Sequence, residues 1–286
     1  MSEVETAGAL AASGEPEVVI LPDPETCSRI AAERIAAALA DAVGARGVAH
    51  WATTGGSTPT GIYRHLATSP LRDAVPWDAV ELWWGDDRFV PRDHPLSNVK
   101  VADDVLLEIG AHSGQSGTGD YGVDVEAGRR PGAPLPATNV HPVPTTEAIA
   151  ESQDAEWCAA RYAEMLKADG PSIEDGWPVF DIVLLGIGPD GHILSVFPDS
   201  PTFDRTEVAL GVPAPTHVEP HVARVTLNSA IVGVARSVFV VSHGDSKAEI
   251  LGHILRGPRD PRRLPAQLAL RRGATWLLDV AAARNA

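Results

Sequence analysis

The stretch VFDIVLLGIGPDGHILSVFPDS, residues 179–200, joins an apolar run to a loop that contains three glycines. A run of this kind is typical of a strand buried on both faces of a parallel sheet. Gly186, Gly188 and Gly191 spell G-x-G-x-x-G, a pattern typical of a turn that binds a dinucleotide. The stretch therefore predicts a parallel strand followed by a loop that holds either a cofactor or a catalytic group.

Further strand-like runs lie on both sides of this stretch, and helical patterns separate many of them. The runs are EVVIL, GVAHWAT, AVELWW, NVHPV, EVALGV, ARVTL and SVFVVSH. Asp23 and Pro24 are typical of an N-cap and a first helical residue, and a helix face of small and apolar residues follows them. Other helical patterns span residues 98–107, 147–167 and 245–255. Strands that alternate with helices predict a single α/β domain, with a largely parallel sheet covered by helices on both faces.

Two segments lack this alternation. Residues 1–15 form an acidic stretch, and residues 110–137 are rich in glycine and proline without any periodicity. We predict a disordered tail for the first segment and a flexible surface insertion for the second. Residues 16–286 then form one domain.

The composition restricts the partners. The chain has 286 residues and a net charge of −15, which argues against general binding to nucleic acid or to anionic membranes. An anionic ligand therefore needs a local cationic pocket. Cys27 and Cys158 are isolated, so we expect free or buried thiols in a reducing compartment, with neither a disulfide nor a metal site. The N-terminal residues lack a leader pattern, and we expect a cytoplasmic protein.

The segment WATTGGSTPTGIYRHL, residues 51–66, has the features of an anion cradle. An extended run ends at Gly55 and Gly56, and Ser57 or Thr58 is expected to cap a helix whose first residue is Pro59. Glycines allow the backbone to approach a ligand, and the free N–H groups at a helix start attract anions. No Walker lysine follows, and an ordinary capped turn between strand and helix is the alternative.

Charged residues follow another predicted strand in LWWGDDRFVPRDHPLSN, residues 82–98. Open α/β sheets bind ligands at the carboxyl ends of strands, so Asp86, Asp87 and Arg88 are candidate site residues. Arg88 can bind a phosphate through two N–H groups, and Asp86 can orient a catalytic group or accept a sugar hydroxyl. A solvated charge cluster is the alternative.

The glycine loop of residues 186–191 does not fit a dinucleotide site in full. Pro198 and Pro201 limit the following helix to about two turns, and the next extended run, EVALGV, ends without a carboxylate. Pro189 also removes one N–H donor from the loop. His192 lies beside Asp190 at the expected start of a short helix, where the helix dipole disfavours a positive imidazole ring. We interpret His192 as a general base, with a histidine held by local hydrogen bonds as the alternative.

A second cation and two further histidines complete the candidates. In VVSHGDSKAEIL, residues 240–251, Asp245 is expected to cap a helix. Lys247 in the first turn opposes the helix dipole, which favours an anionic ligand there, and an exposed lysine is the alternative. His217 and His221 in HVEPH do not predict a metal site, because Pro220 breaks a helical face and no third ligand is evident.

Five motifs, in this order, resemble the 6-phosphogluconolactonase family: TTGGSTPTGIY, WWGDDRFVP followed by SN, DIVLLGIGPDGHILSVFP, RVTLN, and GDSKAEIL followed by LPAQ. The resemblance spans residues 18–283. It implies a Rossmann-like α/β fold, which the glucosamine-6-phosphate deaminases share, and it implies no metal or nucleotide cofactor. The implied reaction is hydrolysis of 6-phospho-D-glucono-1,5-lactone to 6-phosphogluconate in the oxidative pentose phosphate pathway.

The resemblance also implies roles for individual residues. His192 would be the main catalytic residue, with Asp86 as its partner or as an acceptor for a sugar hydroxyl, and Asp190 joins the catalytic group. In the implied mechanism His192 takes a proton from the attacking water, while N–H groups of residues 186–191 stabilise the oxyanion. The residues implied to bind the substrate and its phosphate are Gly55, Gly56, Ser57, Thr58, Arg88, Asn98, Gly188, Gly191, Arg224 and Lys247.

Three features depart from the family pattern. Asp87 stands where the family usually has glutamate, Asp199 stands where a glycine normally follows the Phe-Pro pair, and the insertion at residues 110–137 is long. A glucosamine-6-phosphate deaminase is one alternative, but its extra acidic residue after the shared histidine is absent. A non-catalytic sugar-phosphate sensor is another, and His192 and the lack of a DNA-binding motif argue against it. We expect a small phosphosugar lactone as the substrate of a monomer or weak homodimer.

Overall fold

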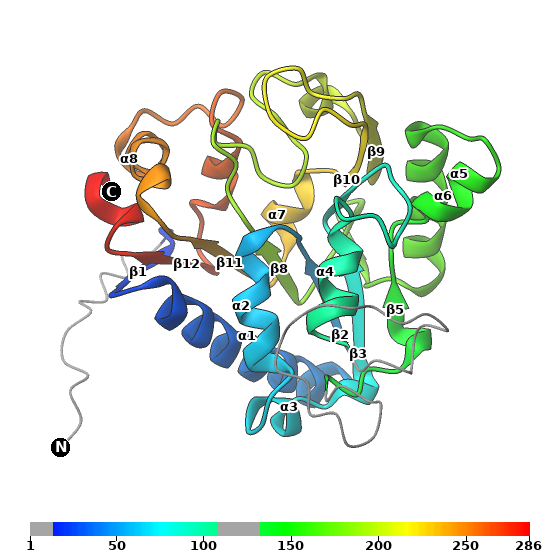
Figure 1. The fold of residues 1–286 in the computed structure, drawn as a ribbon, viewed down its shortest axis with the longest axis horizontal. Coiled ribbons are helices and arrows are strands. Elements are labelled where there is room, and N and C mark those ends of the chain that lie inside the picture. The colour runs from blue at the N-terminus through cyan, green and yellow to red at the C-terminus, as the bar shows by residue number, and fades with distance from the viewer. Residues whose placement is uncertain (1–13, 108–131) are drawn as a thin grey trace.

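A seven-stranded sheet forms the centre of the computed structural model, which describes residues 14–107 and 132–286 (Figure 1). Each pair of neighbouring strands in this sheet is parallel. In spatial order the strands are β1 (Glu17–Leu21), β12 (Ala274–Asp279), β11 (Ser237–Ser242), β8 (Ile182–Leu185), β2 (Ala49–Thr53), β3 (Val80–Trp84) and β5 (Val140–His141). The predicted α/β sheet is confirmed, and the strand predicted from residues 179–200, β8, lies at its centre.

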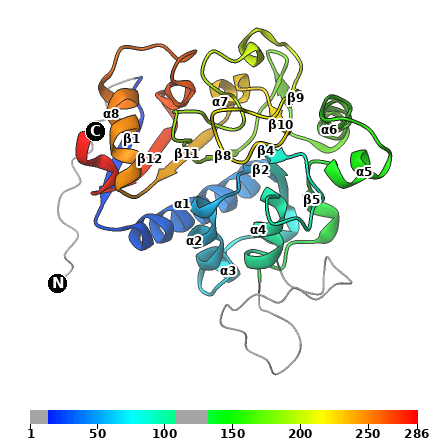
Figure 2. The ribbon, with the colours of Figure 1, turned by 45° about the horizontal axis from the view of Figure 1, so that its top comes forward.

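Helices cover both faces of this sheet. They are α1 (Pro24–Arg46), α2 (Ser57–Leu66), α3 (Leu71–Ala74), α4 (Asn98–Val105), α5 (Thr145–Ala150), α6 (Ala155–Asp169), α7 (Ala230–Val234) and α8 (Ala248–Arg256). Figure 2 shows α1, α2 and α4 on one side, with α6, α7 and α8 on the other. Right-handed crossovers explain the division, because the chain moves one way along the sheet from β1 to β5 and the other way from β8 to β12.

The first helix has the boundaries that its sequence predicts. Asp23 is the N-cap, and its carboxylate accepts a hydrogen bond of 2.7 Å from the backbone N–H of Thr26. Pro24 is the first helical residue, where its missing N–H costs nothing. The helix ends at Gly47, whose φ of 79° lies in the left-handed region that favours glycine.

A small antiparallel sheet lies beside the main sheet and consists of β4 (Asp86–Arg88), β10 (Arg224–Leu227) and β9 (Ala209–Val212). The chain passes from β3 into β4 through Gly85, whose N–H donates to the carbonyl of Thr53 at 2.8 Å. A Cβ at Gly85 would lie 2.6 Å from Leu194, so the close passage requires glycine here. The small sheet therefore carries Asp86, Arg88 and Arg224 past the carboxyl end of β3.

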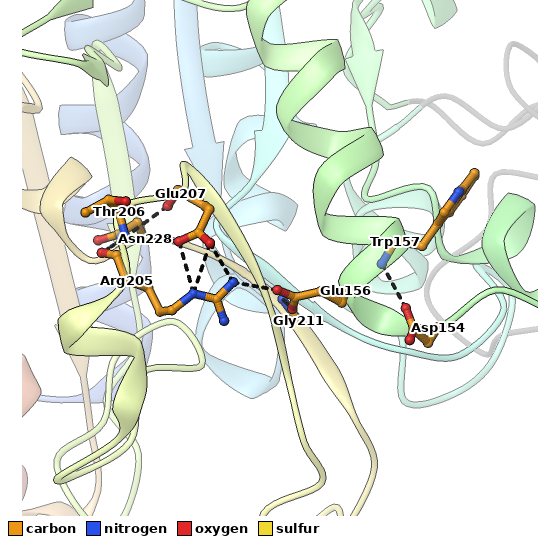
Figure 3. A network of polar contacts seen from close by, with 8 residues as sticks. All are labelled: Asp154, Glu156, Trp157, Arg205, Thr206, Glu207, Gly211 and Asn228. Atoms are coloured by element: carbon orange, nitrogen blue, oxygen red, sulfur yellow. Dashed lines mark hydrogen bonds and ion pairs between the residues drawn. The ribbon is translucent and has the colours of Figure 1, made fainter.

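A surface network joins the small sheet to α6 (Figure 3). Arg205 donates to Glu207 and to Glu156 of α6, and the other oxygen of Glu156 accepts from the backbone N–H of Gly211 in β9 at 3.0 Å. The side-chain amide of Asn228 donates to the carbonyls of Arg205 and Glu207. Exposed ion pairs contribute little energy, so the network acts mainly by setting the position of β9 against α6.

Several local predictions need correction. The helical pattern at residues 147–167 is two helices, α5 and α6, because Asp154 starts a second helix by accepting from the N–H of Trp157 at 2.9 Å. Strand β12 was not predicted. In the predicted insertion, residues 110–131 lie outside the described residues, as do residues 1–13 of the predicted tail. Residues 132–137 pack against the domain, because Ala133 donates its N–H to Leu106 and Leu135 is buried.

Both cysteines are buried free thiols, and burial raises the pKa of each to about 12. They are therefore neutral and unreactive at physiological pH. Across residues 14–107 and 132–286, the helices are too short or too polar to cross a membrane.

Candidate active site

The predicted site residues come from loops at the carboxyl ends of four neighbouring strands, β11, β8, β2 and β3. Between β8 and β2 the direction of the crossovers reverses. Open α/β sheets bind ligands at such a point, because the loops on either side diverge to opposite faces and leave a crevice. The small sheet adds Arg224 from β10 to these loops.

His192 lies in the loop after β8, and Asp190 orients its ring. The ring Nδ1 lies 2.6 Å from Oδ1 of Asp190, and the backbone N–H of His192 donates to the same oxygen at 3.2 Å. A carboxylate only accepts hydrogen bonds, so Nδ1 carries the proton and Nε2 is the nitrogen available to a ligand. Two roles were predicted for Asp86, partner of His192 or acceptor of a sugar hydroxyl, and the first does not hold, because Asp190 is the partner of Nδ1.

Asp190 is negatively charged in this arrangement. Burial opposes its ionisation, but the hydrogen bonds and the attraction of His192 outweigh burial and hold the pKa of Asp190 well below its usual range. His217 contributes in the same direction, because its Nε2 lies 3.0 Å from Oδ2 of Asp190. The sequence does not predict a metal site at His217, and nothing in the spacing of HVEPH predicts its contact with Asp190.

The short helix predicted after His192 is absent. Ile193 and Val196 instead pair across a tight turn in which Leu194 has a φ of 55°. That conformation is incompatible with a continuing α-helix. The dipole argument for His192 is therefore wrong, and the carboxylate of Asp190 provides the local field.

The glycines of this loop make room for its own residues. A Cβ at Gly188 would lie 2.0 Å from Nδ1 of His192, and Gly191 has a φ of 83°. The N–H of Gly188 donates to the carbonyl of His192, and the N–H of Gly191 donates to the carbonyl of Gly188. These two N–H groups are therefore not available as oxyanion donors.

Asp86 is buried and held from two sides. Its Oδ2 accepts from the hydroxyl of Ser195 at 2.6 Å, and its Oδ1 lies 3.3 Å from the side-chain amide nitrogen of Asn98. The same amide nitrogen donates to the backbone carbonyl of Asp86 at 2.8 Å. Ser195 was missed as a site residue, because its contact with Asp86 joins positions 109 apart in the chain. This geometry fixes the direction of the Asp86 carboxylate.

Asn98 also explains why position 55 is glycine. A Cβ at Gly55 would lie 2.0 Å from Oδ1 of Asn98. That oxygen is buried and has no hydrogen-bond partner among the described residues. A buried acceptor without a donor costs free energy.

The two arginines lie opposite each other, since Arg88 of β4 pairs with Arg224 of β10. Arg88 donates to the carbonyl of Leu96 at 2.8 Å, and Arg224 donates to the carbonyl of Pro220 at 3.2 Å. The Nε atoms of both arginines are buried and lack partners within the described part of the chain. Burial lowers the pKa of Arg224, which indicates an incompletely compensated positive charge. Two such donors, side by side, favour an anion.

Lys247 is the third cation. Its Nζ donates to the carbonyl of Ile187 at 2.6 Å, and burial lowers the pKa of Lys247 while the charge of Asp190 opposes that shift. The predicted capping role of Asp245 is wrong. Residues Asp245–Lys247 form a 3₁₀ turn before α8, and Asp245 instead pairs with Arg284 at 2.9 Å.

Helix α2 begins directly after the predicted anion cradle. Its N-cap is Gly56, with a φ of 84°, rather than Ser57 or Thr58. No side chain among the described residues caps the helix. The first N–H groups of α2 are therefore free to bind an anion.

The model of one protein family, glucosamine-6-phosphate isomerases/6-phosphogluconolactonase, matches residues 22–277. The chain belongs to this family. A 6-phosphogluconolactonase from Streptomyces coelicolor is 33% identical over 273 residues, which cover 95% of each protein. One from Synechocystis is 31% identical over 94% of this chain and 98% of that protein. The solved structure of 6-phosphogluconolactonase from Trypanosoma brucei has a TM-score of 0.74 at 28% identity, covering 96% of this chain and 99% of that one.

Asp87, the first departure from the family pattern, is buried and bonds to the start of α4. Its carboxylate accepts from the N–H groups of Arg88 and Asn98 at 2.7 and 2.6 Å and from the hydroxyl of Ser97 at 3.0 Å. It therefore holds the start of α4, and through it the side chain of Asn98. Burial raises the pKa of Asp87 to about 7 against the effect of these donors.

Asp199, the second departure, adopts a φ of 54° on an exposed turn. This value lies in the left-handed region, which glycine adopts without a steric penalty. Among the described residues, no group of three or more histidine, cysteine, aspartate or glutamate side chains is arranged to hold a metal ion.

Proposed function

We propose that this chain hydrolyses 6-phospho-D-glucono-1,5-lactone to 6-phospho-D-gluconate, in the oxidative pentose phosphate pathway. The observation that carries the proposal is that an oriented imidazole, His192, lies at the same edge of the sheet as two arginines whose buried Nε atoms have no hydrogen-bond partner among the described residues. The relatives named 6-phosphogluconolactonase support the same reaction.

In the proposed mechanism, Nε2 of His192 takes a proton from a water molecule as its oxygen attacks the lactone carbonyl carbon. Asp190 stabilises the imidazolium that forms and keeps Nδ1 protonated throughout. The tetrahedral intermediate then breaks its bond between the carbonyl carbon and the ring oxygen. His192 returns its proton to that oxygen, which leaves as a hydroxyl group, and the new carboxyl group ionises.

The remaining residues bind the substrate. The 6-phosphate is held by Arg88, Arg224, Lys247 and the start of α2. Its negative charge balances these cations, and its oxygens accept from the buried Nε donors of the two arginines. Asp86, fixed by Ser195 and Asn98, accepts a hydrogen bond from a sugar hydroxyl. We also propose that the enzyme acts in the cytoplasm as a monomer or weak homodimer, with neither a metal nor a nucleotide.

A coupled assay with freshly prepared lactone tests this function, with the spontaneous hydrolysis subtracted. We expect wild-type activity on the lactone and none on glucosamine 6-phosphate, and we expect His192→Ala to lower kcat by about 100-fold or more. His253→Ala is the matched control, because His253 lies exposed on α8. Wild-type turnover in His192→Ala would show that this mechanism is wrong, and release of ammonia from glucosamine 6-phosphate would favour the deaminase.

A further inference from the structure

The carboxylate of Asp190 lies between two histidines. Its Oδ1 is 2.6 Å from Nδ1 of His192, and its Oδ2 is 3.0 Å from Nε2 of His217. The side chain of His192 is largely buried, whereas 54% of the His217 side chain is exposed. Each carboxylate oxygen therefore has its own imidazole, one facing the site and the other facing solvent.

A second contact between the histidines passes through an aromatic ring. Phe197 lies 4.6 Å from the ring of His192 and 5.5 Å from the ring of His217, measured between centroids. The His217 contact is edge to face, at 78° between the planes. Edge-to-face contact is a favourable arrangement of two aromatic rings, so Phe197 helps to hold the ring of His217.

The loop that carries His217 is anchored in the fold. It connects β9 to β10, and Val218 beside His217 is buried in a small apolar cluster with Phe197 and Val212. Within the loop, Nδ1 of His221 lies 2.8 Å from the carbonyl oxygen of Pro215. The position of His217 is thus set by packing and not by its contact with Asp190 alone.

We propose that His217 is a positioning residue for the reaction, a role that rests on the proposed lactone hydrolysis by His192. Its Nε2–H donates to Oδ2 of Asp190 and prevents the carboxylate from turning about its side-chain bond. The carboxylate then keeps Oδ1 directed at Nδ1 of His192, and His192 keeps Nε2 directed at the substrate.

The surrounding groups do not provide this bond by other means. Lys247 attracts Asp190 electrostatically, but its Nζ donates to the carbonyl of Ile187. Among the residues that the structure describes, His217 is the side chain that donates to Oδ2 of Asp190. Without it, this oxygen is left to water, and the orientation of His192 depends on one carboxylate oxygen alone.

Two substitutions separate the hydrogen bond from the ring. His217→Gln keeps an amide donor near the position of Nε2, and His217→Phe keeps the ring against Phe197 but removes the donor. We expect His217→Phe to lower kcat by about 10-fold with KM changed by less than about 2-fold, because a misdirected base weakens the transition state and not substrate binding. We expect His217→Gln to retain kcat within about 3-fold, since it rescues the donor.

A spectroscopic measurement tests the positioning without any substrate. The short bond between His192 and Asp190 should give a low-field proton NMR resonance, assigned by its loss in Asp190→Asn. We expect this resonance to persist in the wild type and in His217→Gln, and to shift or broaden in His217→Phe. Thermal unfolding identifies any variant that fails to fold. If His217→Phe does not fold, His217→Ala, which removes both the ring and the donor, takes its place.

The outcomes distinguish this proposal from the proposed function. Unchanged kcat and an unchanged resonance in His217→Phe overturn the positioning role. Loss of activity in His217→Gln equal to that in His217→Phe also overturns it, because the donor alone would then not suffice. If the wild type does not hydrolyse the lactone while the resonance responds as expected, the proposed function fails and the positioning of His192 by His217 stands.

Discussion

Asp199 shows how a single residue can cost stability in this fold. It lies on an exposed turn with a φ of 54°, and its N–H donates to the carbonyl of Arg262 at 2.8 Å. The hydrogen bond holds the turn in place, so the backbone of Asp199 must adopt the left-handed conformation. Aspartate tolerates this conformation better than most residues, but glycine adopts it without a steric penalty.

We therefore expect Asp199→Gly to raise the free energy of unfolding by roughly 0.5–1 kcal/mol. Urea denaturation measures this change. Asp93→Gly is the matched control, because Asp93 is exposed in a loop but does not have a positive φ. There glycine should lower stability, because it only increases the freedom of the unfolded chain. Equal effects of the two substitutions would contradict the role of the left-handed backbone.

At the scale of elements, the β4–β10 pair determines where the cations lie. Arg88 and Arg224 stand opposite each other in register, because β4 leaves the main sheet at Gly85 and pairs with β10. Arg224 is 2% exposed, and its guanidinium carbon lies 5.4 Å from the centroid of the Phe197 ring. The β4–β10 pair therefore places the two guanidinium groups next to each other and sets the direction of the Nε donor of each arginine.

We expect Arg88→Lys and Arg224→Lys each to raise KM for the phosphorylated lactone by about 10-fold or more, with kcat changed by less than about 3-fold. Lysine keeps the charge but lacks the Nε donor. Glucono-1,5-lactone, which has no phosphate, is the control substrate, and its kcat/KM should be the same in wild type and variants. An equal loss on both lactones would place these arginines at the reacting carbon instead.

Elements whose signals are local could be predicted from the sequence. Strand β1 and the start of α1 follow from EVVIL, Asp23 and Pro24, because a cap and a proline act within a few residues. Strand β12 was missed, since its short sequence ATWLLD mixes apolar and polar residues without a clear period and is ambiguous until its neighbours are known. The turn after His192 was also mistaken for a helix, because distant contacts determine it, including the bond from Ser195 to Asp86.

In the candidate site, too, the residues with local signals could be predicted and the contacts between distant residues could not. His192, Asp86, Arg88 and Lys247 stand out in motifs, and the sheet brings their loops to one edge. The partners of these residues depend on the folded loops, and sequence spacing does not reveal them. The pairing of Asp190 with His217, across 27 positions and a loop from the small sheet, is the clearest case.

For the whole molecule, net charge and local charge have opposite signs. The chain carries a charge of −15, yet the site gathers three buried or half-buried cations, Arg88, Arg224 and Lys247. Binding of an anion therefore depends on these local donors and not on the long-range field. Local charge also affects stability, because Asp87 is buried beside Asp86, and burial and the neighbouring carboxylate both disfavour the charged form of Asp87.

Asp87 makes global stability depend on pH in an unusual direction. Burial raises its pKa to about 7 in the folded protein, whereas an unfolded aspartate has a pKa of about 3.9. Between these values the folded state holds the proton more tightly than the unfolded state. The contribution of Asp87 to stability is therefore complete below about pH 4, falls as the pH rises, and levels off above about pH 7, with a slope of up to about 1.4 kcal/mol per pH unit.

Asp87→Asn isolates this contribution, because its side-chain oxygen can still accept from the N–H groups of Arg88 and Asn98, and its amide group can donate to Ser97. We expect the unfolding free energies of wild type and variant to be similar near pH 4 and the variant to be more stable by at least about 1 kcal/mol at pH 8. Urea denaturation across this range measures the difference. The variant lacks only the titration of Asp87, so the other groups cancel in the comparison. A wild type that gains stability over the variant as the pH rises would show that the three donors dominate over burial and that Asp87 is a carboxylate throughout.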